Sequence, residues 1–234
     1  MTTPTHAASR RLLKTLPWAL ATAIGLNDFL LEITSIEGSS MTPTLSPTYS
    51  STGAKDFLAW RKWNPAASPA LQRGDIVMYN TPLRAEGTAV KRVVALGGDT
   101  VFLDPRRRPG VDSEGVPRGG ERTAVKGWDV MAAGAVGAEG DGEAGFKVPY
   151  GHVWCEGDNW RASLDSNFYG PMSRSLIVGR ALGVVWPLGR WGAELGREGV
   201  EKEGGGEVVF GGTRVVKGRE EVPEEWEGLV RAGF

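Results

Sequence analysis

Five short segments rich in valine and isoleucine constrain the fold of this chain more than any other feature of its sequence. Each is bounded by glycine, proline, asparagine or aspartate, and together they cover residues 75–79, 90–96, 100–103, 152–156 and 177–186. β-Branched residues favour short strands, and the Gly-Asp pairs at several margins favour tight turns. The sequence therefore predicts a mainly β domain built from hairpins.

Glycine supplies 34 of the 234 residues, about twice its usual share, which argues against a compact all-α protein. Two stretches without clear periodicity, residues 46–71 and 104–146, are predicted to be surface insertions. From residue 191 to 234 the chain alternates glycine with charged residues, a composition typical of a disordered tail that is dispensable for folding. One alternative is open there, because residues 208–210 and 215–216 could pair as an extra hairpin.

Residues 1–14 have the composition of a mitochondrial targeting segment. Basic residues occur among Ser, Thr and Ala, and no acidic residue precedes Asp28. The basic residues are Arg10, Arg11 and Lys14.

An apolar segment, residues 15–36, follows this basic stretch. Asn27, Asp28 and Glu32 interrupt it. The uninterrupted apolar run is about a dozen residues long, whereas a membrane-spanning helix needs roughly 20. Two interpretations are open, a single transmembrane anchor and an amphipathic or core helix. An inserted helix would keep its basic N-terminal side in the matrix or cytosol.

Charge and cysteine content exclude several classes of function. The chain has 27 basic and 28 acidic residues, and a net charge of −1 carries no signature of a nucleic-acid-binding protein. Cys155 is the one cysteine, which rules out an intramolecular disulfide and a cysteine-based zinc cluster. No metal or cofactor is predicted.

The sequence has only two histidines, so a general base of another residue type has to be considered. His6 lies in the N-terminal segment, so a Ser-His-Asp mechanism would depend on His152 alone, for which a structural role is favoured. A serine hydroxyl can also be activated by a neutral lysine, if burial lowers the pKa of the amine from about 10.4 towards neutrality. Lys91 is one candidate among several, because apolar, β-prone residues surround it in the sequence.

Three motifs in a fixed order carry a resemblance to a known family. They are Gly-Ser-Ser-Met-Thr-Pro-Thr-Leu at 38–45, Lys-Arg-Val-Val-Ala-Leu-Gly-Gly-Asp at 91–99, and Gly-Asp-Asn at 157–159 followed by Ser163 and Asp165. In this order and spacing they resemble the boxes of the type I signal peptidases, peptidase family S26. The resemblance covers residues 38–187 and implies a signal-peptidase-like catalytic domain at 37–190, preceded by a membrane helix.

The resemblance implies a serine endopeptidase with a Ser/Lys dyad and no cofactor. Ser40, the residue before methionine, matches the nucleophile, and Lys91 matches the general base. Ser163 matches a serine that hydrogen-bonds the lysine amine. Met41 has two open interpretations, a cleft residue that keeps the lysine dry and an ordinary core methionine.

The chain departs from the bacterial pattern at two places. Gly38 stands where those enzymes have a hydroxyl donor to the oxyanion hole, so the backbone N–H of Ser40 and a replacement donor are expected to serve. Asp165 matches a carboxylate that pairs with an arginine two residues later, but here that position is Asn167. Two alternatives are open, Arg161 as the replacement cation and Asp165 as a simple turn cap.

Further residues resemble the subunit 2 branch of the mitochondrial inner membrane proteases, namely Tyr-Gly-His-Val-Trp at 150–154, Asn167, and Trp-Pro at 186–187. The resemblance implies several partners: precursor proteins with intermembrane-space sorting peptides, a sister catalytic subunit and inner-membrane lipid, but no nucleic acid. It also implies a single-pass protein whose catalytic domain faces the intermembrane space. The rival hypothesis is a catalytically silent structural subunit of the same complex.

Overall fold

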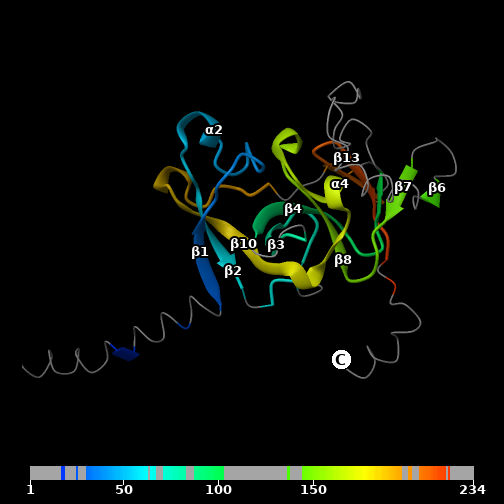
Figure 1. Cartoon of the computed structure of the whole chain (residues 1–234), viewed down its shortest axis with the longest axis horizontal. Helices are drawn as coiled ribbons and strands as arrows, with labels where there is room; N and C mark the ends of the chain where they lie inside the picture. Colours follow the sequence, from blue (N-terminus) through cyan, green and yellow to red (C-terminus); the bar gives the residue numbers. More distant parts are fainter. Residues whose placement is uncertain are drawn as a thin grey trace, which may run out of the picture.

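The computed structural model describes residues 17–18, 25, 30–62, 64–66, 71–82, 87–102, 136–137, 144–196, 200–201, 206–219 and 221. The regular secondary structure of this part of the chain is mainly β-strand, which confirms the predicted mainly β class (Figure 1). The strands are β1 (Leu31–Ser35), β2 (Phe57–Arg61), β3 (Ile76–Asn80), β4 (Thr88–Leu96), β5 (Thr100–Phe102), β6 (Val136–Gly137), β7 (Ala144–Lys147), β8 (His152–Glu156), β9 (Met172–Ser173), β10 (Ile177–Trp186), β11 (Val200–Glu201), β12 (Glu207–Phe210) and β13 (Thr213–Val216). The short helices are α2 (Tyr49–Thr52), η3 (Trp160–Ala162), α4 (Ser166–Tyr169), η4 (Arg174–Leu176) and η5 (Leu188–Arg190).

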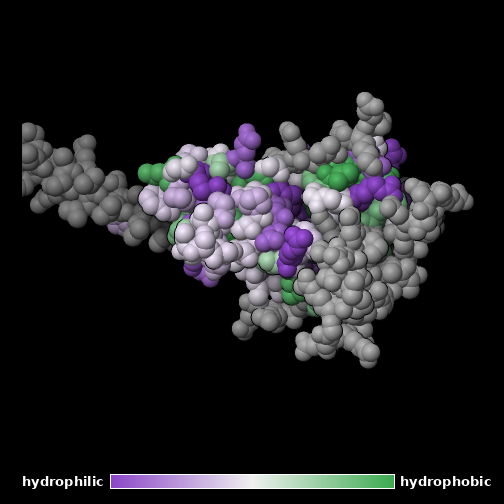
Figure 2. Space-filling model, turned by 90° about the horizontal axis from the view of Figure 1, so that it is seen from above, coloured by the Kyte–Doolittle hydropathy of each residue, from purple (hydrophilic) through white to green (hydrophobic). Residues whose placement is uncertain are grey.

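Two antiparallel sheets organise these strands. One has the order β1-β2-β10-β3-β4-β8-β9 and the other the order β11-β12-β13-β5-β7-β6. The five segments predicted as strands from their composition correspond to β3, β4, β5, β8 and β10. The described surface visible in Figure 2 is mostly white to pale purple, with smaller strongly hydrophilic and apolar patches, and most large apolar side chains lie in the core.

β4 is buried on both faces and connects the two sheets. Val94 packs in one core cluster with β5 and β8, whereas Val93 packs in another with β3 and β8. The chain passes from β4 to β5 through a turn at Gly98, whose φ of +88° favours glycine. Lys91 therefore projects from a strand that the core holds on both sides.

A third cluster lies between β1, β2 and β10. Leu58 and Trp60 of β2 are completely buried, and the indole N–H of Trp60 donates to the hydroxyl of Thr34 in β1 at 2.8 Å. The remaining members of this cluster come from the serine-containing loop and the neighbouring strands: Ile36, Met41, Leu45, Ile76, Ala181 and Val184. The loop that carries Ser40 is therefore anchored in the core.

The structure corrects two of the predictions made from the sequence. Residues 57–61, expected in a surface insertion over 46–71, form β2 between β1 and β10. Residues 31–35, expected at the end of a membrane helix over 15–36, form β1 at the edge of the sheet. Both strands are short, and both pair with partners that the sequence pattern alone does not locate.

The predicted targeting segment at 1–14 and most of the predicted anchor lie outside the described residues. Within the residues that are described, no helix is both long enough and apolar enough to cross a membrane. Most of the 104–146 insertion also lies outside them, but its final residues enter β7, which pairs with β5.

The C-terminal segment, predicted as a disordered tail from residue 191, contains a folded hairpin. β12 and β13 pair through a two-residue turn in which Gly211 and Gly212 have φ values of 52° and 102°. β13 continues the second sheet by pairing with β5. The alternation of apolar and polar residues within β12 gives the hairpin a buried face, although the surrounding composition is polar. The extra-hairpin alternative is therefore the one that the structure shows.

Candidate active site

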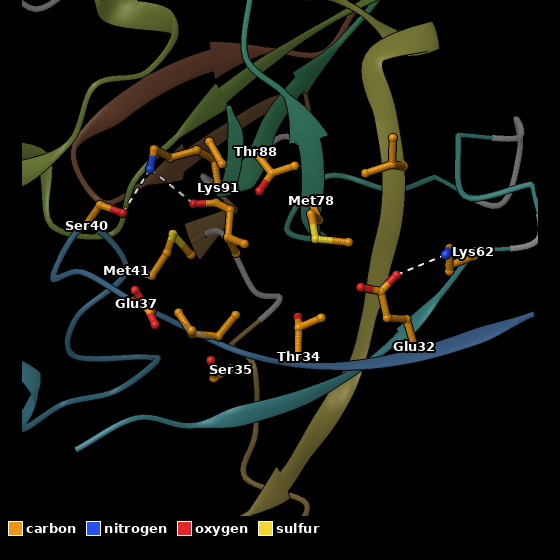
Figure 3. Close-up of a pocket in the computed structure, with 14 residues that line it drawn as sticks. Glu32, Thr34, Ser35, Glu37, Ser40, Met41, Lys62, Met78, Thr88 and Lys91 are labelled. Atoms are coloured by element: carbon orange, nitrogen blue, oxygen red, sulfur yellow. Dashed lines mark hydrogen bonds and ion pairs between the residues drawn. The ribbon is translucent and has the colours of Figure 1, made fainter. Parts of the chain in front are cut away.

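Ser40 lies in a tight loop between β1 and α2. Gly38 has a φ of +88°, which turns the chain out of the strand. Thr42 closes the next turn, because its N–H and its hydroxyl donate to the carbonyl of Ser39 at 3.2 and 2.8 Å. Met41 is 1% exposed and packs in the core beneath the turn. The loop is thereby fixed, with the Ser40 hydroxyl directed towards Lys91 (Figure 3).

Lys91 reaches Ser40 from β4. Its amine donates to the Ser40 Oγ at 2.8 Å and to the carbonyl of Val90 at 3.1 Å (Figure 3). The side chain is buried, and the residue is only 5% exposed. The structure thus brings together the two residues that the motifs predict as a dyad, from positions 51 residues apart in the sequence.

The surroundings of Lys91 change the proton affinity of its amine. Burial lowers the pKa of Lys91 below its ordinary value of 10.5, because the charged form loses solvation. Asp165, Cys155 and Asp158 act in the opposite direction without cancelling this effect. The neutral amine is therefore accessible at a lower pH than in a solvated lysine, and in that form it can accept the proton of the Ser40 hydroxyl.

This environment predicts a distinct pH dependence of cleavage. We expect log(kcat/KM) to rise with unit slope as pH increases and to level off below pH 10.5, the ordinary lysine value. The sign follows from the charge, because activity is lost as pH falls through the folded-state pKa and the amine becomes protonated. Initial rates on a peptide substrate without titratable groups measure the profile, and circular dichroism checks that the fold persists. A rise that continues to pH 10.5 would contradict the expectation.

Asp165 accepts a group of hydrogen bonds behind the dyad and caps α4. Its carboxylate accepts the backbone N–H groups of Gly157 at 2.9 Å and of Asn167 at 3.1 Å. The side-chain amide of Asn167 donates to it at 3.2 Å, and the hydroxyl of Ser163 also donates to it. Neutral donors therefore surround this carboxylate, and it has the geometry of the turn cap that the sequence left open.

Ser163 and Arg161 form contacts other than those considered from the sequence. Ser163 donates to Asp165 and, among the described residues, forms no hydrogen bond with Lys91. Arg161 stacks over the ring of Trp160, with its guanidinium carbon 4.7 Å from the ring centroid. The Arg161 alternative for the missing cation is thus not the contact that the structure forms.

Asn159 is a supporting residue that sequence reasoning did not single out. Its N–H donates to the carbonyl of Ser40 at 2.9 Å. Its side-chain amide donates to the carbonyl of Ser39 at 3.0 Å and to the hydroxyl of Thr42 at 3.1 Å. The Gly-Asp-Asn motif was the available signal for it. No acceptor within the described residues takes the N–H of Ser40, so this donor is available for a developing oxyanion.

Gly157 is packed too closely against the nucleophile for any side chain. A Cβ at this position would lie 2.3 Å from the Ser163 Oγ and 2.6 Å from the carbonyl oxygen of Ser40. We expect Gly157→Ala to lower kcat/KM about 10²-fold, because it displaces the reacting hydroxyl. The matched control is Gly183→Ala, whose Cβ would meet nothing within 4 Å and which should keep wild-type activity. Equal kcat/KM values in the two folded variants would contradict this expectation.

A cleft of about 770 Å³ opens in front of the dyad. Its walls include β1 and the first residues of β4. Figure 3 shows Ser40 and Lys91 at one end, and the ion pair of Glu32 with Lys62, at 3.0 Å, towards the other. Apolar side chains that line it are Ile36, Met41, Met78, Ala89, Val90 and Val178. Met41 thus belongs to both the core and the cleft, which polar and charged side chains also line.

The described residues contain no cluster of side chains suited to bind a metal ion. Over the described ranges, no group of three or more His, Cys, Asp or Glu side chains could hold a metal ion.

Comparison with known proteins decides the family. Residues 9–186 match the family described as signal peptidase, peptidase S26. The chain belongs to this family. The serine endopeptidase class predicted from the motifs is thereby confirmed for this S26 peptidase.

Several relatives of the S26 peptidase are subunits of mitochondrial proteases. Mitochondrial inner membrane protease subunit 2 of Saccharomyces cerevisiae is 30% identical over 182 residues, which cover 76% of this chain and 82% of the yeast protein. The mouse subunit 2 is 32% identical over 173 residues, covering 74% and 77% of the two chains. Subunit 1 of Schizosaccharomyces pombe is 25% identical over 166 residues, covering 71% and 80%. The predicted resemblance to the subunit 2 branch is confirmed.

Among solved structures, a signal peptidase I from Enterococcus faecalis is similar at 21% identity. The match has a TM-score of 0.29 and covers 48% of this chain and 97% of the bacterial one.

Proposed function

We propose that this S26 peptidase removes hydrophobic sorting peptides from proteins delivered to the intermembrane space, with Ser40 as nucleophile and Lys91 as general base. The observation that carries the proposal is the 2.8 Å contact between the Lys91 Nζ and the Ser40 Oγ in a buried site. A desolvated amine beside a serine hydroxyl is the arrangement that a Ser/Lys mechanism requires. The relatives that are named mitochondrial inner membrane proteases support the compartment.

The reaction proceeds in two halves. Neutral Lys91 accepts the proton of Ser40 while the Oγ attacks the carbonyl carbon of the scissile bond. The N–H of Ser40 donates to the oxyanion that forms, and Asn159 holds the loop that carries this donor. The Lys91 ammonium then protonates the leaving amine, and water attacks the acyl-enzyme with the same lysine as base.

The cleft supports an extended substrate. β1 is the terminal strand of the seven-stranded sheet, and its residues line the cleft. A peptide laid along such an edge pairs its main chain with the strand, and its side chains enter the neighbouring pockets. The apolar patch around Met78 and Val90 can contact hydrophobic side chains of a sorting peptide, while Glu32, Glu37 and Lys62 add charged groups to the same cleft.

Replacement of the yeast relative tests the function. In Saccharomyces cerevisiae cells that lack the 30% identical subunit 2, this chain should restore precursors of intermembrane-space proteins to their mature size, as seen on immunoblots. Ser40→Ala should leave those precursors unprocessed. Restoration by the Ser40→Ala variant would favour the rival hypothesis of a silent structural subunit.

The proposed topology places the catalytic domain in the intermembrane space, held by the N-terminal segment and associated with a sister subunit. Relatives named subunit 1 and subunit 2 support a heteromeric complex. Protease added to mitochondria should digest the domain once the outer membrane is ruptured, but not before. Resistance that lasts until the inner membrane is dissolved would overturn this topology.

A further inference from the structure

The C-terminal hairpin contacts the strand that precedes the catalytic loop. β8 ends at Glu156, whose buried carboxylate accepts the hydroxyl of Thr213 at 2.7 and 3.0 Å. The indole N–H of Trp154 donates to the same carboxylate at 2.8 Å. Thr213 is the first residue of β13 and is also buried. Because these hydrogen bonds are buried and one partner is a carboxylate, breaking them costs free energy, and the hairpin resists displacement of the end of β8.

The residues that follow Glu156 contact the nucleophile. Gly157 packs so closely that a Cβ there would lie 2.6 Å from the carbonyl oxygen of Ser40. Asn159 donates its N–H to that same oxygen at 2.9 Å. Two contacts therefore meet at one atom of the Ser40 backbone, and a shift of the turn at 157–159 moves Ser40 with it.

A second link joins the C-terminal region to the residue after the base. Arg92 donates to the carbonyl of Gly196, and to that of Gly74 at 2.8 Å. Its guanidinium also binds both carboxylate oxygens of Asp158, at 2.8 and 2.6 Å. In the ladder between β4 and β8, Arg92 lies opposite Glu156. The chain beyond residue 191 thus contacts Arg92, which follows Lys91, and Glu156, which precedes the turn packed against Ser40.

We infer that Thr213 is a positioning residue for the dyad. Its hydroxyl holds the Glu156 carboxylate, and Glu156 in turn sets the turn at 157–159 against Ser40. Residue 213 lies beyond residues 9–186, the part that matches the family, so no family motif assigns it a role. The inference rests on the proposed Ser/Lys mechanism and adds a requirement for the C-terminal hairpin.

The test compares three variants of the full-length purified chain. Thr213→Val keeps the shape of the side chain and removes the hydroxyl, so we expect kcat to fall about tenfold with KM within twofold of wild type. Thr213→Ser restores the donor and should return kcat to within about twofold of wild type. Val208→Ala, in the same hairpin, removes core packing without touching Glu156, and should lower the melting temperature while leaving kcat within about twofold.

A double-mutant cycle on kcat between Thr213 and Glu156 is the second measurement. Glu156→Met removes the acceptor at similar side-chain length, and should lower kcat about tenfold by itself. In that background Thr213→Val should change kcat by less than about twofold, because the bond is already absent. If Thr213→Val alone does not fold, Glu156→Met carries the kcat test.

Three outcomes overturn the inference. They are a kcat within about twofold of wild type in both single variants, equal losses in Thr213→Val and Thr213→Ser, and losses that multiply in the double variant. Failure of the proposed function itself gives a different result, because Ser40→Ala would then cleave as fast as wild type.

Discussion

Ser40→Ala and Lys91→Ala are each expected to lower kcat/KM by at least about 10⁴-fold while the protein remains folded. The reason is that the hydroxyl and the amine, 2.8 Å apart, act as one unit, so loss of either removes the whole nucleophilic step. The double variant should therefore be no slower than the slower single one. Lys91→Arg should be equally inactive, because a guanidinium stays protonated at any usable pH and cannot accept a proton.

Exposed residues of the same types supply the controls for these variants. Ser51 lies on the surface in α2, and Lys147 is an exposed residue of β7. Ser51→Ala and Lys147→Ala should keep kcat/KM within about twofold of wild type. The cleavage rates of the purified variants on a sorting-peptide substrate, determined under single-turnover conditions, are compared with that of wild type. Substantial cleavage by either folded dyad variant would exclude the Ser/Lys mechanism.

Ending the chain at Gly196 is expected to abolish folding. Val208, Phe210 and Val215 of the hairpin pack in one buried cluster, and removing a large core side chain typically costs about 2–5 kcal/mol. Three such losses together approach or exceed the roughly 5–15 kcal/mol by which a domain is stable. This reverses the prediction from composition, in which everything from residue 191 is dispensable.

A chain that ends at Arg219 is the matched control, because it keeps β12, β13 and their contacts with β5. It should unfold cooperatively near the wild-type temperature when followed by circular dichroism. Cooperative unfolding of the chain that ends at Gly196, at the same temperature, would show that the hairpin contributes no stability.

Strong local patterns account for what the sequence predicts correctly about the fold. The Val- and Ile-rich segments of β3, β4 and β10 need no knowledge of their partners, because their composition and flanking turns already mark them as strands. β1 and β2 lack such a Val- and Ile-rich composition. β1 alternates Leu31 and Ile33 with polar residues, directly after an apolar stretch that resembles a helix. Pairing with distant strands decides their state, and local propensity does not report such pairing.

In the candidate site, too, some residues can be predicted from local sequence and others cannot. Ser40 and Lys91 are recognisable because each lies in a contiguous motif. The contacts of Asn159 and Thr213 link positions 120 and 57 residues apart, and they depend on which distant segments the two sheets bring together. The hydroxyl of Ser163, predicted to hydrogen-bond the Lys91 amine, donates to Asp165 instead. A motif thus indicates which residues gather, whereas the individual hydrogen bonds depend on the folded geometry.

Cys155 has a consequence for handling the protein. It is the chain's one thiol, it is completely buried in the core beside β4, and burial raises its pKa well above the usual range. Maleimides and disulfide exchange act on an accessible thiolate, which this residue does not offer in the folded state. Leu188 is 68% exposed, so Leu188→Cys would place a selectively reactive thiol on the surface. A fluorophore or spin label attached there could report on subunit assembly without first removing the natural cysteine.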